Sequence, residues 1–190
     1  DAQDWPLESA ISGFAPGQFE LTRRHKPDAL RACDDAIMYK RLVKAIAQQQ
    51  GLEATFMAKP FADQAGSGMH IHASVLDANG RNIVASPPSA PADALKHAIG
   101  GLQRSDQDCL LLFAPHANSY RRFVLNAFVP LNDVWGYNNR TVAMRIPHSD
   151  EANTRIEHRI AGADANIYLV TAAVLAGMLL VAGVAILVAV

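Results

Sequence analysis

Polar and apolar residues alternate along residues 69–75, and this stretch predicts a half-buried β-strand. Successive side chains of a strand point to opposite faces of the sheet. His70, His72 and Ser74 therefore share a polar face, while the residues between them form an apolar one. The strand is preceded by Gly-Ser-Gly at residues 66–68, a turn whose backbone amides can approach an anion. The pattern predicts a strand that forms the floor of a polar site.

Three longer stretches have the apolar content or the 3.6-residue period of a helix. The first begins at Pro27-Asp28 and ends near Gly51, because proline suits a first helical turn and glycine a helix end. A second helix is expected over residues 92–112, where Gly100-Gly101 either weakens the helix or marks close packing. The third, over residues 164–178, is apolar on all sides and predicts a buried helix.

Shorter alternating stretches predict the remaining strands, and residues 1–12 are expected to be an irregular lead-in. The other strands are predicted at residues 18–22, 54–57, 81–84, 141–146 and 154–160, with a hairpin turn at 77–80. Residues 118–139, rich in Asn and aromatic residues, are expected to be a long segment beside the site. Strands that alternate with helices and include a hairpin predict an α+β fold, with an antiparallel sheet flanked by helices.

The composition describes one domain, or a large part of one, with a sizeable core. The chain has 190 residues, 50% of them hydrophobic, and a net charge of -1. These values argue against disorder and against nucleic-acid binding. Cys33 and Cys109 lack metal-ligand spacing and suit the reducing cytoplasm, and the N-terminus has no signal-peptide pattern. We therefore expect a cytoplasmic protein.

Residues 171–190 carry no charge, and their length matches that of a membrane-spanning helix. No Lys or Arg flanks the run and no Trp anchors either end. A helix buried in the domain is therefore the preferred interpretation, and a membrane anchor is the alternative.

A second cluster of charges lies on the predicted strand 154–160. Arg155, Glu157 and Arg159 point to one face if the strand is regular. They form either a surface ladder of ion pairs or a metal-binding carboxylate flanked by guanidinium groups that hold phosphate or carboxylate oxygens. His70 and His72 are open to a similar pair of interpretations, as a hydrogen-bonded pair or as ligands.

Taken together, the polar residues suit divalent metals and a polyphosphate. Glu20, His70 and Glu157 supply carboxylate and imidazole donors, and four arginines lie between residues 121 and 145. Cations and guanidinium groups neutralise the charge of a phosphoryl group during its transfer. The chain has no Walker-type loop and no Rossmann glycine pattern. If it uses ATP, it therefore binds the nucleotide on a sheet.

These motifs resemble the glutamine synthetase family, in its catalytic C-terminal domain, and the nearest resemblance is to the branch that includes γ-glutamyl-polyamine synthetases. The matching runs keep the family's order and are residues 15–20, 59–72, 118–122, 139–147, 155–159 and 163–166. The resemblance implies the family's curved antiparallel sheet. Several such runs in series are far more specific than any one of them.

The resemblance also implies roles for individual residues. Glu20 would bind one Mg²⁺ or Mn²⁺ ion, and His70 with Glu157 would bind another. The residues expected to contact ATP are His72, Ser74, Arg140, Arg145 and Arg155. The residues expected to hold glutamate are Gly66, Arg122 and Arg159. Catalytic roles are expected for Arg122 and Arg140.

The implied reaction is ATP-dependent. The side-chain carboxylate of glutamate is phosphorylated, and ammonia or an amine then displaces phosphate to give an amide. The family forms homo-oligomeric rings in which an N-terminal domain completes the neighbouring site. This chain is expected to be a partial catalytic domain over residues 1–190 that lacks the N-terminal domain, with residues 179–190 departing from the family pattern.

Four departures from the family pattern bear on activity. Gly13 stands where a metal-binding Glu is usual, and Ala65 stands where an Asn contacts substrate. Phe128 replaces the Glu that takes a proton from ammonium, and Leu125-Asn126 replaces a Pro-Gly turn. These changes favour a bulkier amine over ammonia, or else a catalytically impaired homologue that acts as a binding or assembly subunit.

Overall fold

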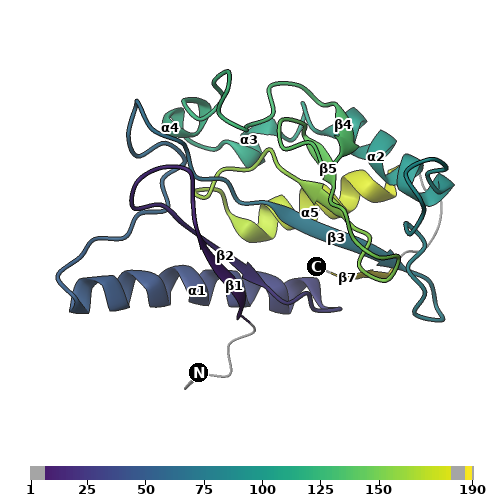
Figure 1. The fold of residues 1–190 in the computed structure, drawn as a ribbon, viewed down its shortest axis with the longest axis horizontal. Helices are drawn as coiled ribbons and strands as arrows, with labels where there is room; N and C mark the ends of the chain where they lie inside the picture. Colours follow the sequence, from purple (N-terminus) through teal and green to yellow (C-terminus); the bar gives the residue numbers. More distant parts are fainter. Residues whose placement is uncertain (1–6, 181–186, 190) are drawn as a thin grey trace.

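The computed structural model describes residues 7–180 and 187–189, which form a five-stranded sheet, a separate two-stranded ribbon and five helices (Figure 1). The strands are β1 (Leu7–Ser12), β2 (Phe19–Arg23), β3 (Ile71–Leu76), β4 (Trp135–Tyr137), β5 (Met144–Ile146), β6 (Ile156–His158) and β7 (Leu187–Ala189). The helices are α1 (Ala29–Gln49), α2 (Asp93–Ser105), α3 (Leu110–Phe113), α4 (Ala117–Tyr120) and α5 (Ile167–Leu179). The predicted α+β class is confirmed.

The larger sheet has the strand order β4-β5-β6-β3-β7. Its neighbours are antiparallel except at the β4–β5 edge, which is parallel. Along β3, Ile71, Ala73 and Val75 are buried while His72 and Ser74 are half-buried, as the alternation predicted. The apolar face of this strand belongs to the core, and its polar face is available to the site.

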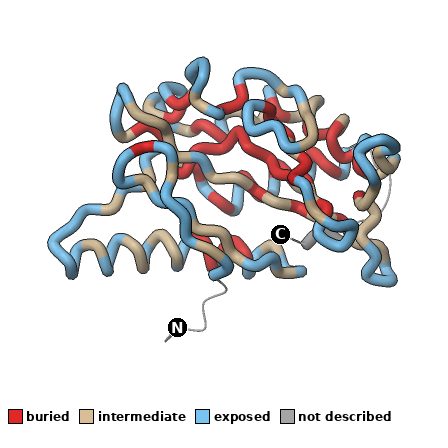
Figure 2. Tube along the Cα trace, viewed as in Figure 1, coloured by how far each residue is buried: buried red, intermediate tan, exposed pale blue. Residues whose placement is uncertain are grey.

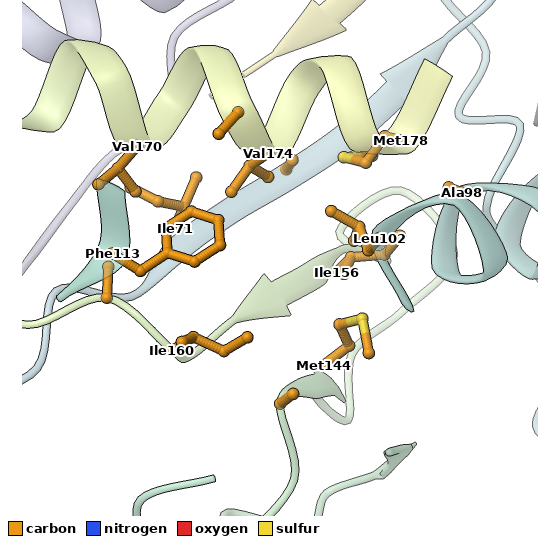
Figure 3. Close-up of a cluster of buried hydrophobic side chains, with 14 of the residues drawn as sticks. Ile71, Ala98, Leu102, Phe113, Met144, Ile156, Ile160, Val170, Val174 and Met178 are labelled. Carbon is orange, nitrogen blue, oxygen red and sulfur yellow. The ribbon is translucent and has the colours of Figure 1, made fainter. Parts of the chain in front are cut away.

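Helix α5 packs against the apolar face of the sheet and against helices α1, α2 and α3 (Figure 3). Asn166 caps its first turn by accepting from the amides of Tyr168 and Leu169. A Cβ on Gly101 of α2 would lie 2.1 Å from the Gly177 carbonyl oxygen of α5. Gly101 therefore marks close packing, one of the two alternatives that the sequence left open.

Helix α1 begins after Asp28, whose side chain accepts from the Arg31 amide, and ends before Gly51, whose φ is +70°. Its four buried residues, Ala32, Cys33, Asp35 and Ala36, all lie near its N-terminal end. The rest of the helix extends beyond the core, with most residues exposed or half-buried (Figures 1 and 2). Ile37 and Ile46, two apolar residues of this helix, are therefore exposed.

Three predictions about strands were wrong. Residues 7–12 form β1, which pairs with β2 with an irregularity near Glu8, so they are not an irregular lead-in. Residues 54–57 form no strand, and Phe56 packs edge-on against Tyr39 of α1. Residues 81–84 make one bridge, at Asn82, after the predicted turn at 77–80. Each outcome depends on which other segment the residues meet, and the pattern within the segment does not specify that.

The expected helix over residues 92–112 is divided in two. α2 ends at Ser105, whose hydroxyl donates to the backbone carbonyls of Gly101 and Leu102, and α3 begins at Leu110. The side chain of Asp106, just after α2, turns into the core to meet His158. Asp106 itself keeps a helical backbone, and residues 106–109 form the turns that separate the two helices.

Among the described residues, every helix falls short of the length or the hydropathy that a bilayer crossing requires. Residues 1–6, 181–186 and 190 lie outside the described part of the chain. Most of the segment 179–190, expected to depart from the family pattern, therefore lies outside it too.

Candidate functional site

Three neighbouring strands bring a set of polar side chains to one carboxylate. β6 lies between β3 and β5, and Glu157 is paired with His72 on one side and with Arg145 on the other. Residues that are directly paired across neighbouring strands point to the same face. The register therefore brings these three side chains together on the polar face, where Glu157 is only 2% exposed.

Glu157 accepts hydrogen bonds on both carboxylate oxygens. Arg145 Nη1 donates to Oε2 at 2.6 Å, and Arg159 Nη1 donates to Oε1. His70 Nδ1 lies 3.1 Å from Oε1, and His72 Nε2 lies 3.9 Å from the same oxygen. The structure thus brings together His70 and Glu157, which are far apart in the sequence.

Burial decides the protonation of these groups. It lowers the pKa of His72 to about 4 and also lowers the pKa of His70, so both imidazoles are neutral near pH 7. Burial alone would raise the pKa of Glu157, but the hydrogen bond from His70 and the basic groups around it, Arg159 among them, lower it overall. An ionised carboxylate therefore lies between two guanidinium groups and two neutral imidazoles.

The polar edge continues along β3 and the chain before β6. Arg155 Nε donates to His72 Nδ1 at 3.0 Å, and Arg155 Nη1 donates to the Asn153 carbonyl. The Ser74 hydroxyl donates to the Thr154 carbonyl at 2.9 Å. Arg155 therefore pairs with an imidazole here, while Glu157 and Arg159 form a buried ion pair, so the three residues do not form a surface ladder.

Arg122 lies near His70, and its side chain is buried. Its Nη1 donates to the Ile160 carbonyl at 2.6 Å and its Nη2 to the Arg159 carbonyl at 3.0 Å. Burial lowers the pKa of Arg122 to about 10, so it stays charged at neutral pH. A Cβ on Gly68 would lie 2.6 Å from this guanidinium, and one on Gly66 would lie 2.6 Å from a backbone oxygen. The glycines allow the turn to approach Arg122 closely.

Two predicted site residues lie apart from Glu157. Glu20 is exposed on the ribbon and makes no hydrogen bond or ion pair within the described part of the chain. Arg140 is exposed in the turn before β5. Its charge adds to the burial that lowers the pKa of Arg159, so the two guanidinium groups are near each other.

Gln18 joins the ribbon to the glycine turn, a role that the sequence did not predict. Its Oε1 accepts from the amides of Phe14 and Ala15, and its Nε2 donates to the Gly66 carbonyl and to the Ser67 hydroxyl. The one available signal was an amide side chain directly after a Pro-Gly turn. This single side chain links two segments that carry predicted site residues.

Gly13 lies directly under the Gln18 side chain. A Cβ at position 13 would lie 2.6 Å from Gln18 Oε1 and 2.7 Å from its Cγ. The volume that a side chain at position 13 would need is therefore occupied by Gln18.

Residues 125–128, which contain two of the departures from the family pattern, have an unusual backbone. Asn126 and Phe128 have φ values of +61° and +51°, which side chains other than glycine rarely adopt. The Phe128 carbonyl accepts from Arg159 Nη2 at 3.2 Å. Its ring meets the ring of Phe14 edge-on, with centroids 5.9 Å apart. The backbone of this segment thus contacts an arginine that binds Glu157.

His158, next to Glu157, points to the opposite face of β6. Its Nε2 lies 3.1 Å from Asp106 Oδ1, and both side chains are buried. The ring of Phe113 packs against the imidazole, with centroids 4.8 Å apart. No signal in the sequence linked Asp106 to this strand.

Two open hollows of about 460 and 430 Å³ lie on another part of the surface, and neither is lined by Glu157 or its partners. They share Lys40, His116 and Asp164. Lys40 Nζ already donates to the Ala163 carbonyl, and Asp164 accepts from the Ser119 hydroxyl. The convergent polar groups of the chain are at Glu157, so the hollows are not the candidate site.

Comparison with known protein families decides the assignment. A model described as "Glutamine synthetase, catalytic domain" matches residues 1–184. The chain belongs to the glutamine synthetase family. The expected resemblance is therefore confirmed, and the family consists of ATP-dependent carboxylate–amine ligases.

The chain is similar to several amine ligases of this family. It is 47% identical to the gamma-glutamylputrescine synthetase of Escherichia coli over 92% of its own length and 37% of the relative's. It is 40% identical to a glutamate–isopropylamine ligase of a Pseudomonas species, over 88% of its length and 37% of the relative's. The chain thus spans a little over a third of the length of these curated glutamine synthetase relatives.

Solved structures of the family agree with the fold. Ligand-free GmaS matches 94% of this chain and 41% of its own, with a TM-score of 0.79 and 35% identity. A complex of GmaS with ADP matches with a TM-score of 0.78 and 31% identity, over 94% of this chain and 43% of its own. The fold of this chain is that of part of a glutamine synthetase relative.

The donor chemistry at Glu157 fits a divalent cation in part. Glu157 and His70 present a carboxylate and an imidazole within 3.1 Å of each other, and Mg²⁺ often takes only one or two protein ligands, with phosphate oxygens and waters for the rest. No group of three His, Cys, Asp or Glu side chains arranged to hold a metal was found among residues 7–180 and 187–189. The cluster therefore fits an ion that substrate phosphates help to bind.

Proposed function

We propose that this chain is part of an ATP-dependent ligase that joins the side-chain carboxylate of glutamate to an amine. Its β-sheet supplies one side of the active site. The observation that carries the proposal is the convergence of His70, Arg145 and Arg159 on the buried carboxylate of Glu157. Such a cluster can bind phosphate oxygens through the arginines and a cation through the carboxylate and imidazole. The relatives named above catalyse this class of reaction.

The proposed reaction has two steps. A glutamate side-chain oxygen attacks the γ-phosphorus of ATP, and the bond from that phosphorus to the ADP oxygen breaks. The nitrogen of a neutral amine then attacks the carbonyl carbon of the acyl phosphate, and the carbon–oxygen bond to phosphate breaks. One N–H proton leaves the nitrogen, and phosphate or solvent accepts it. The barrier comes from bringing anions together, so fixed positive charge lowers it.

Each predicted site residue has a place in this proposal. Arg140 and Arg145 would face the transferred phosphoryl group, and the expected nucleotide contacts are His72, Ser74 and Arg155. Arg159 and Gly66 would hold glutamate, while Arg122, which binds the Arg159 carbonyl, would position that strand. Mg²⁺ or Mn²⁺ would neutralise phosphate charge, with one ion bound at His70 and Glu157 and another at Glu20.

Assembly and compartment are also parts of the proposal. Ile11, Phe14 and Phe19 of the ribbon are exposed, and covering them in a homo-oligomer would bury apolar surface. In a ring of such chains, neighbouring subunits would complete the site near Glu20. The described cysteines, Cys33 and Cys109, are free thiols, which suits the cytoplasm.

A thermal-shift titration with ATP and Mg²⁺ tests the proposal. Ligands that bind the folded state raise the melting temperature, so the protein should be stabilised by the two together. His70→Ala should abolish the shift, while His97→Ala, at an exposed position on α2, should leave it intact. ADP release with glutamate and an amine should follow the same pattern. Absence of any shift at millimolar Mg²⁺ and ATP in the unmodified protein would overturn the proposal.

One observation favours a second candidate, a homologue that binds ligands without turnover. Position 13 has no carboxylate, and the side chain of Gln18 occupies the space beside it. A protein that is stabilised by ATP and Mg²⁺ but releases no ADP with any amine would favour this candidate. Release of ADP that depends on the amine would exclude it.

A further inference from the structure

We propose that Asp106 and His158 are positioning residues for the ligase reaction, because their buried hydrogen bond fixes strand β6 from behind and so orients the Glu157 carboxylate. The inference rests on the proposed ligase function and adds to it two residues that need touch no substrate. Asp106 and His158 meet on the core side of β6, whereas Glu157 belongs to the polar side.

The first observation is that His158 is a polar residue on the apolar face of the sheet. In the strand register it is paired with Ile71 of β3 and with Met144 of β5, and both are buried core residues (Figure 3). Directly paired residues point to the same face. The ring of Phe113 packs against the imidazole as well, with centroids 4.8 Å apart. His158 is therefore fully buried among apolar side chains.

The second observation is that the two side chains share one hydrogen bond and have unpaired atoms besides. His158 Nε2 lies 3.1 Å from Asp106 Oδ1, whereas His158 Nδ1 and Asp106 Oδ2 are buried without a partner among the described residues. A carboxylate only accepts, so the imidazole carries a hydrogen on Nε2. Unpaired buried atoms cost free energy, and apolar residues of similar volume are often as stable as a buried polar pair. Stability therefore does not explain the pair, whereas holding β6 in one arrangement does.

The third observation is that the support behind β6 is itself held. Asp106 directly follows α2, and α2 packs closely on α5 where Gly101 meets Gly177. The next helix, α3, is tied to the chain beyond β6, because the Gly162 amide donates to the Phe113 carbonyl at 3.0 Å. The turn between α2 and α3 is thus a fixed support, and the hydrogen bond of Asp106 connects that support to β6.

The constraint acts on the chemistry because β6 is short. The strand has three residues, and Glu157 directly precedes His158, so a change in the tilt of one residue moves the other. Glu157 binds two arginines and faces His70 at the point where the phosphoryl group would be transferred. A misplacement of about 1 Å can cost about 100-fold in rate. The expected nucleotide contacts on β3 lie on another strand, so the chemical step should be affected more than ATP binding.

A double variant separates positioning from stability. Asp106→Ala together with His158→Phe replaces the pair by apolar side chains of similar total volume, so the melting temperature should stay within a few degrees of that of the unmodified protein. The rate of ADP release is measured with ATP, Mg²⁺, glutamate and whichever of ammonium, putrescine and isopropylamine supports the fastest turnover. In the double variant kcat should fall about 10- to 100-fold while KM for ATP stays within about threefold. A stable double variant with full kcat would show that the pair is only structural.

A conservative variant decides the matter even if the double variant melts much lower. Asp106→Asn keeps an oxygen that can accept from His158 Nε2, whereas Asp106→Ala does not. Asp106→Asn should keep kcat within about threefold, and Asp106→Ala should lower it at least about tenfold. Equal losses in these two variants would contradict the inference.

Thr171→Val is the matched control, because it removes another buried hydrogen bond, the one between Cys33 of α1 and Thr171 of α5. It should leave kcat unchanged. If kcat fell as far in Thr171→Val as in Asp106→Ala, the loss would follow from any weakened core contact, and the positioning role would be rejected.

A measurement without turnover keeps the two proposals separate. The ion pairs with Glu157 hinder rotation of the Arg145 and Arg159 guanidinium groups, and NMR of their Nη protons measures that rotation. It should become about tenfold faster in the double variant, the scale of one lost hydrogen bond, and stay unchanged in Thr171→Val. If no amine supports ADP release, the ligase proposal fails, and faster rotation still supports the orientation of Glu157 by the pair. Unchanged rotation in the double variant would overturn the inference whatever the turnover.

Discussion

Strands β3 and β6 form the floor of the candidate site, and the β1–β2 ribbon lies outside the main sheet. Each region carries a glutamate that is predicted to bind a metal ion, yet the fold holds the two glutamates in opposite ways. Glu157 is nearly inaccessible and both of its oxygens bind arginines. Glu20 is exposed, and the adjacent Phe19 is 76% exposed. The floor is part of the core sheet, whereas the ribbon is a sheet of two strands only.

The comparison teaches where the site is rigid. The floor is built on strands whose opposite face is packed against α5, so its side chains are fixed by the core (Figure 3). The ribbon is linked to the body through the side chain of Gln18, through the contact of Phe14 with Phe128, and through the hydrogen bond from Arg23 Nη1 to the Ala32 carbonyl. Segments with few buried contacts open more readily than the core. The two halves should therefore respond very differently to substitution.

The largest expected difference is between the two glutamates. Glu157→Ala leaves Arg145 and Arg159 without their carboxylate, and breaking a buried ion pair from one side costs about 3–5 kcal/mol of unfolding free energy. Glu20→Ala should change the same free energy by no more than about 0.5 kcal/mol, as exposed substitutions do. Urea denaturation of the two variants measures both values. Equal losses would show that the ribbon is as firmly held as the floor.

A smaller, local effect is expected at Gln18. Gln18→Ala removes the acceptor of the Phe14 and Ala15 amides, and each hydrogen bond contributes about 0.5–1.5 kcal/mol. Hydrogen exchange at these two amides should become about tenfold faster, since about 1.4 kcal/mol corresponds to a factor of ten in the opening equilibrium. The β3 amides should keep their protection. Gln48→Ala, on an exposed part of α1, is the control.

The smallest expected difference in stability is between two variants at Gly13. Gly13→Ala and Gly13→Glu both force the Gln18 side chain to move and so disturb the same hydrogen bonds, and their unfolding free energies should differ by less than about 1 kcal/mol. Only Gly13→Glu adds a carboxylate, so only that variant should bind Mn²⁺ more tightly in a calorimetric titration with ATP. Identical titrations for the two variants would show that position 13 does not contribute to a metal site.

Prediction from the sequence succeeded where a local pattern decides the structure. The alternation at residues 69–75 gave both the strand and its polar face, and the caps at Asp28 and Gly51 gave the bounds of α1 to within two residues. It failed at residues 7–12 and 54–57. The first is a strand that pairs with β2, and the second has no strand partner in the described part of the chain and contacts α1 through Phe56.

The sequence by itself determined the chemistry available to this protein: a polar strand face with two imidazoles, a carboxylate between arginines, and the motif series of the glutamine synthetase family. These features depend on residue type and on spacing along the chain. Only the tertiary structure decided which of them meet. The register of β3, β6 and β5 joins Glu157 to His72 and Arg145, and the separate ribbon keeps Glu20 apart. The physical reason is that strand pairing is chosen by the burial of a whole apolar face, which no local stretch specifies.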